Sequence, residues 1–219
     1  RPLMKDGMLQ SKRNSPVNKD VIYLDFRAEV SAFDKIFHFS KENLDERKNL
    51  LRQRSKYLKR LFNGEPMRFK GTQDNKVGNL EILSENTVKC IGKILNKEYT
   101  DIRVAEHKLY RNMGTSVYMK NKYEMGYSEA NAGSGEIAVV QLVRRIEKAR
   151  DYSLVLLDEP EVSLHPGAQE NLKEYLLEAI KTKKLQVVIS THSPTLIKGL
   201  PSSAIKLFKT NEYGKFYVQ

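Results

Sequence analysis

Two adjacent carboxylates, Asp158 and Glu159, follow the apolar run Leu154–Leu157 and precede Pro160. A short apolar run without alternation is typical of a strand that is buried on both faces of a parallel sheet. The carboxylates would then lie at the carboxyl end of that strand, where open α/β sheets bind their ligands. A carboxylate that holds Mg²⁺ beside one that positions water is the pair that nucleotide hydrolysis requires. A simpler interpretation stays open, in which Asp158 only caps the following turn.

A second apolar run, Leu185–Ile189, leads toward His192 and has the pattern of another buried strand. Apolar residues at helical spacing between residues 168 and 183 predict a helix that connects the two strands. A strand, a helix and a strand form a right-handed crossover, so both strands end at the same edge of the sheet. We therefore expect Asp158, Glu159 and His192 to lie close together.

A turn of small residues, 131–136, precedes a third apolar pattern, which predicts a helix beyond Glu136. Small residues before a helix let backbone N–H groups approach an anion, and the helix dipole adds to the attraction. A Gly-Ser-Gly sequence also occurs in turns that bind nothing, so both interpretations stay open for the turn taken alone.

The order and spacing of these motifs resemble the C-terminal lobe of an ABC-type ATPase. The shared features are the Gly-Ser-Gly-acid turn and its helix, the strand that ends at Asp158, the turn Ser163–Pro166, and His192. The resemblance covers roughly residues 127–210 and is specific, because four motifs agree in order. More narrowly, the motifs resemble the RecF/SMC-like branch of this family. That branch includes OLD-type ATPases and the ATPase subunits of Septu and related retron antiviral systems.

The resemblance implies a role for each matching residue. The strand becomes the Walker B segment, in which Asp158 helps to hold Mg²⁺ and Glu159 polarises the attacking water. His192 becomes the switch histidine that contacts the γ-phosphate of ATP. Ser163 and His165 belong to the D-loop position, which communicates between two nucleotide sites.

The turn before the helix matches the signature motif, which in that family faces the nucleotide bound by the opposite subunit. The matching residues are Gly133, Ser134, Gly135 and Glu136. The usual motif has serine at its second position, whereas this chain has Gly133 there and a hydroxyl one residue later, at Ser134. The atom that donates to phosphate is therefore left open.

The sequence contains no G-x-x-x-x-G-K-[ST] phosphate-binding loop. The nearest fragment, Gly92-Lys93-Ile94, has Thr87 where the first glycine should be and lies in a helix predicted from Ser84 to about Lys97. We expect a lobe upstream of Arg1 or a separate chain to supply the loop.

Composition narrows the class of protein. A chain of 219 residues allows one large domain or two small ones, and its net charge of +11 favours a polyanionic partner. The single Cys90 excludes an internal disulfide, and the four histidines show no zinc spacing. Because no apolar run is long enough for a membrane span and no signal peptide is evident, we expect a cytoplasmic protein without membrane contact.

The remaining patterns divide the chain into three predicted parts. Residues 1–40 form an N-terminal loop and a strand at Val21–Arg27, residues 41–100 a charged helical insertion, and residues 101–219 the ATPase lobe. Glycine and asparagine residues between 63 and 80 predict a loop.

Two β-hairpins are also predicted. One lies between Ile102 and Tyr127, and the other is formed by residues 204–208 with residues 216–218.

A long charged helix is predicted to begin at Ser40. Residues 41–60 contain eight Lys or Arg and three Asp or Glu, a net charge of 8 − 3 = +5. This helix could contact nucleic acid phosphates or an acidic partner. It could equally be a solvated face that covers an apolar stripe, since long basic side chains pack their stems and keep their charges in water.

These patterns predict an α/β fold, the C-terminal lobe of an ABC-type P-loop ATPase domain with a helical insertion. The resemblance implies a subunit that binds and hydrolyses ATP with Mg²⁺ and acts on nucleic acid in antiviral defence or DNA repair. It also implies a homodimer closed around the nucleotide and a separate nuclease subunit, with a Septu or retron system as the first choice. One alternative is a non-catalytic, degenerate or split lobe that serves as an assembly module for a nuclease. Another is a nuclease that holds metal with these acids, although no further acidic cluster is present.

Overall fold

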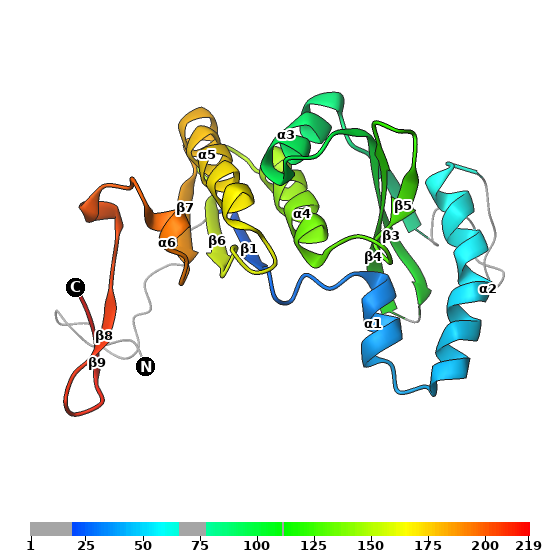
Figure 1. The fold of residues 1–219 in the computed structure, drawn as a ribbon, viewed down its shortest axis with the longest axis horizontal. Coiled ribbons are helices and arrows are strands. Elements are labelled where there is room, and N and C mark those ends of the chain that lie inside the picture. The colour runs from blue at the N-terminus through cyan, green and yellow to red at the C-terminus, as the bar shows by residue number, and fades with distance from the viewer. Residues whose placement is uncertain (1–18, 66–77, 111) are drawn as a thin grey trace.

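The structure is a computed structural model, and it describes residues 19–65, 78–110 and 112–219. A parallel sheet and an antiparallel sheet contribute to one main hydrophobic core. Helices α4 (Ser134–Lys148) and α5 (Pro166–Lys183) cover one face of the parallel sheet, and α3 (Glu85–Leu95) connects them to the antiparallel sheet (Figure 1). The predicted mixed α/β fold is confirmed.

The parallel sheet has three strands in the order β1-β6-β7. They are β1 (Val21–Asp25), β6 (Leu154–Asp158) and β7 (Gln186–Ser190). Helix α5 connects β6 to β7, which confirms the predicted crossover. In the register of the sheet, Asp25 lies beside Asp158, and Asp158 lies beside Ser190. The ends of all three strands therefore form one row at the carboxyl edge.

Only one face of the parallel sheet is covered within the described part of the chain. Side chains of alternate residues, such as Leu24, Val155 and Leu157, enter the core. On the opposite face, Tyr23 and Val188 are each 58% exposed. Because parallel sheets are ordinarily covered on both faces, this apolar surface is a candidate for burial by another segment.

The antiparallel sheet has the order β2-β3-β4-β5. Its strands are β2 (Gly78–Ile82), β3 (Tyr99–Tyr110), β4 (Asn112–Asn121) and β5 (Gly126–Ser128). The pairing of β3 with β4 confirms the hairpin predicted between residues 102 and 127.

The loop predicted over residues 63–80 is wrong at its end, because β2 begins at Gly78. A Cβ atom at Gly78 would lie 2.6 Å from the carbonyl oxygen of Glu106. This glycine permits close approach to β3 and does not mark a turn. Residues 66–77 of the predicted loop lie outside the described residues.

The long charged helix predicted from Ser40 is present as α2 (Leu44–Phe62), but it begins four residues later than predicted. A separate helix that was not predicted, α1 (Ala32–Phe39), lies before it. Ser40 is extended, and the side chain of Asn43 caps α2 by accepting a hydrogen bond from the N–H of Glu46. Arg47 stabilises the break, since its guanidinium donates to the carbonyls of Phe37, Ser40 and Glu42.

The C-terminal part of the chain is exposed from residue 202 onward, apart from the partly buried Ile205, whereas Leu196 is buried. It contains the short helix α6 (Pro194–Ile197), a 3₁₀ turn at Ser202–Ala204, and the strands β8 (Phe208–Thr210) and β9 (Phe216–Val218). The last two strands pair as a hairpin, as predicted, but its first strand is Phe208–Thr210 and not residues 204–208. None of the helices in the described residues is both long and apolar enough to cross a membrane. The division of the chain at residues 40 and 100 stays a prediction.

A buried polar network crosses the antiparallel sheet beside the core. The N–H of Leu109 donates to Nδ1 of His107 at 3.3 Å, so the neutral ring carries its proton on Nε2. Nε2 lies 2.9 Å from the hydroxyl of Ser116, which can therefore accept this proton in a hydrogen bond. His107 is 0% exposed, and burial lowers its pKa to about 4. The folded protein thus disfavours a charged His107.

Protonation of His107 should destabilise the protein in mild acid. Its pKa falls from 6.5 in the reference state to about 4 in the fold, so the unfolded chain binds this proton first. The stabilising contribution is complete above pH 6.5 and is lost as the pH falls toward 4. We expect a loss on the order of 3 kcal/mol in the free energy of unfolding, measured by urea denaturation between pH 7 and pH 4.

The matched comparison is His107→Gln, in which this part of the pH dependence should disappear. Burial raises the pKa of Glu129, which acts in the opposite direction but is present in both proteins. Equal pH profiles for the two proteins would contradict the assignment to His107.

Candidate functional site

The carboxyl edge of the parallel sheet collects the first group of predicted residues. Asp158 is the last residue of β6, and Glu159 follows it directly. The sheet ladders continue past the strand ends, because the N–H of Phe26 donates to the carbonyl of Asp158 and that of Glu159 donates to the carbonyl of Ser190. The backbone that carries both carboxylates is therefore held from both sides.

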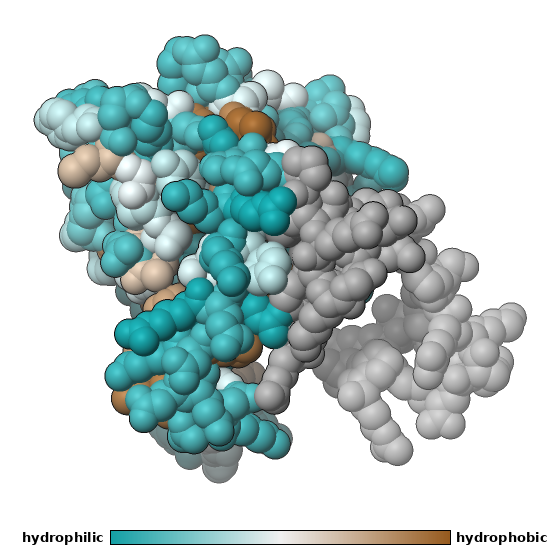
Figure 2. Space-filling model, turned by 90° about the vertical axis from the view of Figure 1, so that its right-hand side faces the viewer, coloured by the Kyte–Doolittle hydropathy of each residue, from teal (hydrophilic) through white to brown (hydrophobic). Residues whose placement is uncertain are grey.

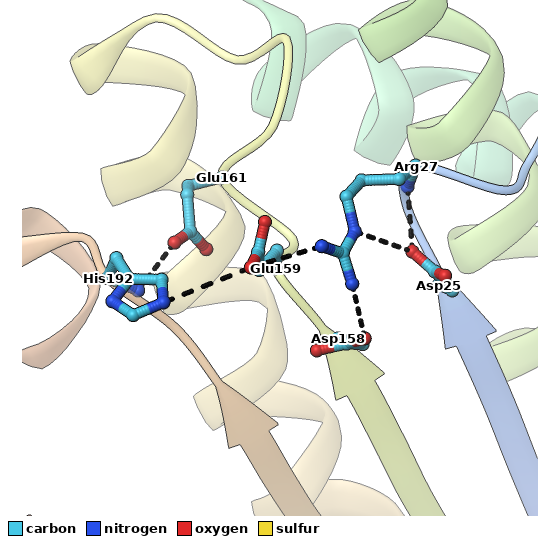
Figure 3. A network of polar contacts seen from close by, with 6 residues as sticks. All are labelled: Asp25, Arg27, Asp158, Glu159, Glu161 and His192. Carbon is cyan, nitrogen blue, oxygen red and sulfur yellow. Dashed lines mark hydrogen bonds and ion pairs between the residues drawn. The ribbon is translucent and has the colours of Figure 1, made fainter.

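Glu159 has an unusual backbone conformation, with φ of +45°. Few residues other than glycine occupy this left-handed region, and those that do often lie at functional sites. Here the conformation follows the end of β6 and leaves the Glu159 side chain between His192 and Arg27 (Figure 3). Oε1 of Glu159 lies 3.9 Å from Nε2 of His192 and 3.4 Å from Nη1 of Arg27.

His192 reaches the site from the end of β7. Its imidazole is 90% exposed, so a bound molecule could contact it directly. Its backbone N–H donates to Oε1 of Glu161 at 2.7 Å, which joins the loop after β7 to the loop after β6. The following Ser193 caps α6 and also donates its hydroxyl proton to Gln169 on α5. The structure thus brings Asp158, Glu159 and His192 to one edge, as predicted.

Arg27 is a member of this site that the sequence analysis does not identify. Its Nη2 lies 2.9 Å from Asp158, its Nη1 contacts Glu159, and its Nε lies 3.5 Å from Asp25. The negative charge of Glu159, followed by the hydrogen bond to Asp25, raises the pKa of Arg27, so the guanidinium stays charged. A usable signal was present, since Arg27 is the last residue of the predicted strand Val21–Arg27 and lies two residues beyond the end of β1.

The residues predicted as the signature turn form a second group, at the beginning of α4. The hydroxyl of Ser134 donates a hydrogen bond to the hydroxyl of Ser163 at 2.8 Å. A Cβ atom at Gly135 would lie only 2.4 Å from the carbonyl oxygen of Ser163. Gly135 is therefore required for close packing of the two loops, whatever else the turn does. Gly133 and Ser134 are exposed, whereas Gly135 is buried.

Glu136 is buried and already bonded within the chain. Its carboxylate accepts hydrogen bonds from Lys97, Tyr99, Tyr127 and the N–H of Gly133, at 2.6–2.9 Å. Burial acts to raise the pKa of Glu136, but these four donors outweigh it and lower the pKa. Glu136 therefore stays charged and shapes the turn. No sequence pattern indicates its three side-chain donors, which lie outside α4.

His165 begins α5 and lies near the same turn. Its Nδ1 accepts the N–H of Ala168 at 3.3 Å, which makes it the N-cap of the helix. The imidazole is otherwise exposed. Among the described residues, no hydrogen bond or ion pair joins residues 133–136 to Asp158, Glu159 or His192. Within one chain, the two predicted groups are thus separate clusters connected by the loop 159–163.

Both groups are compatible with a bound nucleotide and magnesium, although neither is a metal cage. The described residues contain no group of three or more His, Cys, Asp and Glu side chains arranged to hold a metal ion. Mg²⁺ is usually bound by one or two carboxylates, water and substrate phosphates, and not by a cage of protein ligands. The 28% exposed carboxylate of Asp158, at a sheet edge, suits that manner of binding.

A surface groove elsewhere has a volume of about 830 Å³ and lies between α2 and the antiparallel sheet. Residues such as Lys59, Arg103 and Tyr118 line it, and none of the predicted site residues does. Its size alone does not make it the active site, because the groups suited to chemistry lie at the other sheet.

Two phage proteins are similar in sequence to parts of this chain. The chain is 28% identical over 146 residues to protein ea59 of Escherichia phage lambda, an alignment that covers 64% of this chain and 25% of that protein. It is 25% identical over 140 residues to the Old nuclease of Escherichia phage P2, which covers 52% of this chain and 23% of the relative. The chain thus spans about a quarter of the length of these curated relatives.

Solved structures of SMC proteins also match part of this chain. One, from a study of ATP-driven dimerization and DNA-stimulated activation of SMC ATPases, matches with a TM-score of 0.45 and 16% identity, over 62% of this chain and 81% of that chain. The SMC head domain from Thermotoga maritima matches with a TM-score of 0.40 and 15% identity, over 75% of this chain and 51% of that one.

A family model matches residues 8–198, which is most of the chain. Its description is an AAA domain, putative AbiEii toxin, of a type IV toxin–antitoxin system. The match includes both groups of residues described above and all three strands of the parallel sheet. The chain belongs to this family of AAA domains.

Proposed function

We propose that this chain is the catalytic lobe of an ATPase that closes as a homodimer around ATP and Mg²⁺. The observation that carries the proposal is the convergence of Glu159 and His192, 3.9 Å apart, beside Asp158 at the carboxyl edge of a parallel sheet. Ligands of open α/β sheets bind at such an edge. Membership of an AAA family supports the choice of a nucleotide as the ligand.

Each residue at the edge has a distinct part in this proposal. Asp158 would hold Mg²⁺, which supplies positive charge for the phosphates. Glu159 would accept a proton from the attacking water or orient it, as a general base does. His192, exposed at the end of β7, would donate a hydrogen bond to the terminal phosphate.

The turn before α4 would contact the nucleotide bound by the opposite subunit. Gly133 and Ser134 are exposed and can supply a backbone N–H and a hydroxyl, whereas Glu136 would keep the turn in shape. Ser163 and His165 would communicate between the two sites, since Ser163 bonds directly to Ser134. The separation of the two groups within one chain is consistent with a site completed by two copies.

The phosphate-binding loop, whose motif the sequence lacks, would come from another segment of the same polypeptide or from a second chain. The described residues leave one apolar face of the parallel sheet exposed, including Tyr23 and Val188, and this exposed face supports the proposal that another segment supplies the loop. A segment that places a phosphate loop at the sheet edge could pack there and bury that face.

We further propose that the ATPase acts on nucleic acid in antiviral defence, with a nuclease subunit as partner and a Septu-like or retron system as the first choice. The likeness to the Old nuclease supports a nuclease connection. Helix α2 offers a surface for nucleic acid, because Lys48, Arg52, Lys56 and Lys59 form an exposed stripe along it. Figure 2 shows this side of the molecule, where hydrophilic residues dominate the described surface.

A second candidate is a non-catalytic lobe retained to assemble a nuclease complex. The absence of a phosphate-loop motif from the sequence favours it. The arrangement of Asp158, Glu159 and His192 at one edge opposes it, since assembly alone does not require these residue types. ATP turnover by the protein that contains this chain together with its phosphate loop separates the two candidates.

Substitution of the two neighbouring carboxylates should give different results in that protein. Glu159→Gln keeps the size of the side chain but removes the base, so ATP hydrolysis should fall by roughly 10²- to 10⁴-fold while ATP binding persists. Asp158→Asn should weaken Mg²⁺-dependent ATP binding, because a charged metal ligand is lost. Steady-state turnover and calorimetric titration with ATP would measure these effects. Parental turnover by Glu159→Gln would show that the base lies elsewhere.

Neutralising the basic stripe of α2 should weaken nucleic acid binding at every sequence. In the triple variant Lys48→Gln, Arg52→Gln, Lys56→Gln, each lost phosphate contact releases fewer counterions, so the slope of log K against log salt should flatten by about 0.9 per contact on duplex DNA. Fluorescence anisotropy at several salt concentrations measures this slope. A control that removes the same charge from scattered exposed lysines, Lys89, Lys122 and Lys181, should keep the parental slope. If both triple variants behave alike, α2 is only a solvated face.

A further inference from the structure

Arg27 contacts both carboxylates that the proposed function assigns to magnesium and water. Its two terminal nitrogens are divided between them, with Nη2 at 2.9 Å from Asp158 Oδ2 and Nη1 at 3.4 Å from Glu159 Oε1 (Figure 3). The positive charge that these carboxylates need is thus supplied by the chain itself.

The root of the Arg27 side chain has a separate attachment. Asp25 Oδ1 accepts the backbone N–H of Arg27 at 2.9 Å and lies 3.5 Å from its Nε. The terminal nitrogens can therefore leave Asp158 and Glu159 while Asp25 still holds the side chain near the edge. The side chain is 52% exposed, so solvent surrounds half of it and packing does not fix its position.

We propose that Arg27 is a resident cation that exchanges with magnesium. Before nucleotide binds, its guanidinium neutralises Asp158 and Glu159; when Mg²⁺ and nucleotide arrive together, the guanidinium leaves the carboxylates and binds a phosphate of the nucleotide. The proposal rests on the proposed function, because it concerns the same site and takes a nucleoside triphosphate as the ligand.

Electrostatics gives the reason for an exchange. A metal ion on Asp158 and a guanidinium on the same carboxylate are two positive charges within a few ångströms, so they repel each other. Phosphate oxygens brought by the nucleotide offer the guanidinium a new partner, and arginine binds phosphate through two parallel N–H groups. A metal ion that arrives without phosphate would displace the Arg27 guanidinium but would offer it no new partner. The edge therefore discriminates against free metal and favours the metal–nucleotide complex.

Two affinities should change in opposite directions in Arg27→Gln. Mn²⁺ is used as the probe for the metal alone, and its binding to the chain without nucleotide is followed by electron paramagnetic resonance. We expect Mn²⁺ to bind about fivefold more tightly or better, at the lower end of typical coupling between two ligands. In the protein that includes the phosphate loop, affinity for Mg²⁺–ATP should fall about tenfold, because a charge-assisted contact with phosphate is lost.

Arg145→Gln is the matched control, since it removes the same charge near the same sheet. Arg145 bonds to the carbonyl of Tyr23 and to Glu29 but contacts neither Asp158 nor Glu159. It should leave Mn²⁺ affinity unchanged. An equal gain in both variants would reduce the effect to net charge and overturn the proposal.

Asp158→Asn combined with Arg27→Gln should abolish the gain in Mn²⁺ affinity, because the ligand that Arg27 protects is gone. A gain that survives in the double variant would overturn the proposal, as would an Arg27→Gln variant that folds but shows no gain.

If Arg27→Gln does not fold, Arg27→Lys replaces it, because lysine keeps the charge but cannot contact both carboxylates with one planar group. It should show a smaller gain, and parental affinity for Mn²⁺ would count against the exchange. These readouts do not require hydrolysis, so they can fail while the Glu159→Gln result still supports the ATPase.

Discussion

The register of three parallel strands is the constraint on which the candidate site depends. Because β1, β6 and β7 end in one row, Asp25, Asp158 and the start of the loop after β7 meet at a single edge. Three carboxylates gathered there would repel one another if they were alone. Arg27 offsets that repulsion with one guanidinium that contacts Asp25, Asp158 and Glu159. The edge therefore contains its own positive charge before any ligand binds.

Close backbone packing ties the second group of residues to the first. Gly135 lets the beginning of α4 approach the loop that follows β6, because any side chain there would collide with the carbonyl of Ser163. Glu136 holds the turn from within by accepting four hydrogen bonds, two of them from tyrosine hydroxyls that come from β3 and β5. A displacement of the loop 159–163 would therefore also displace the turn before α4. In the proposed dimer, this connection would provide a physical basis for communication between the two nucleotide sites.

The sequence by itself determined the local elements and most of the candidate residues. Apolar runs without alternation indicate β6 and β7, and apolar spacing indicates α4 and α5, because a helix that buries one face repeats apolar residues along that face. The crossover rule then predicts that Asp158, Glu159 and His192 lie at one edge of the sheet. These inferences needed only short-range pattern and general rules of chain topology.

Only the tertiary structure decided which partners those residues have. Arg27 and Asp158 are 131 residues apart in sequence, so no local pattern reports their contact. The side-chain donors that hold Glu136 come from other elements, and no pattern around Glu136 indicates them. Gly78 was predicted as part of a loop, whereas it lies in β2 and allows close approach to β3. The break between α1 and α2 likewise depends on the cap at Asn43 and on carbonyls that Arg47 gathers from a folded loop. Hydrogen bonds, ion pairs and close backbone contacts form between residues that are close in space. Folding brings together residues that are far apart in the sequence, so a local sequence pattern does not reveal these contacts.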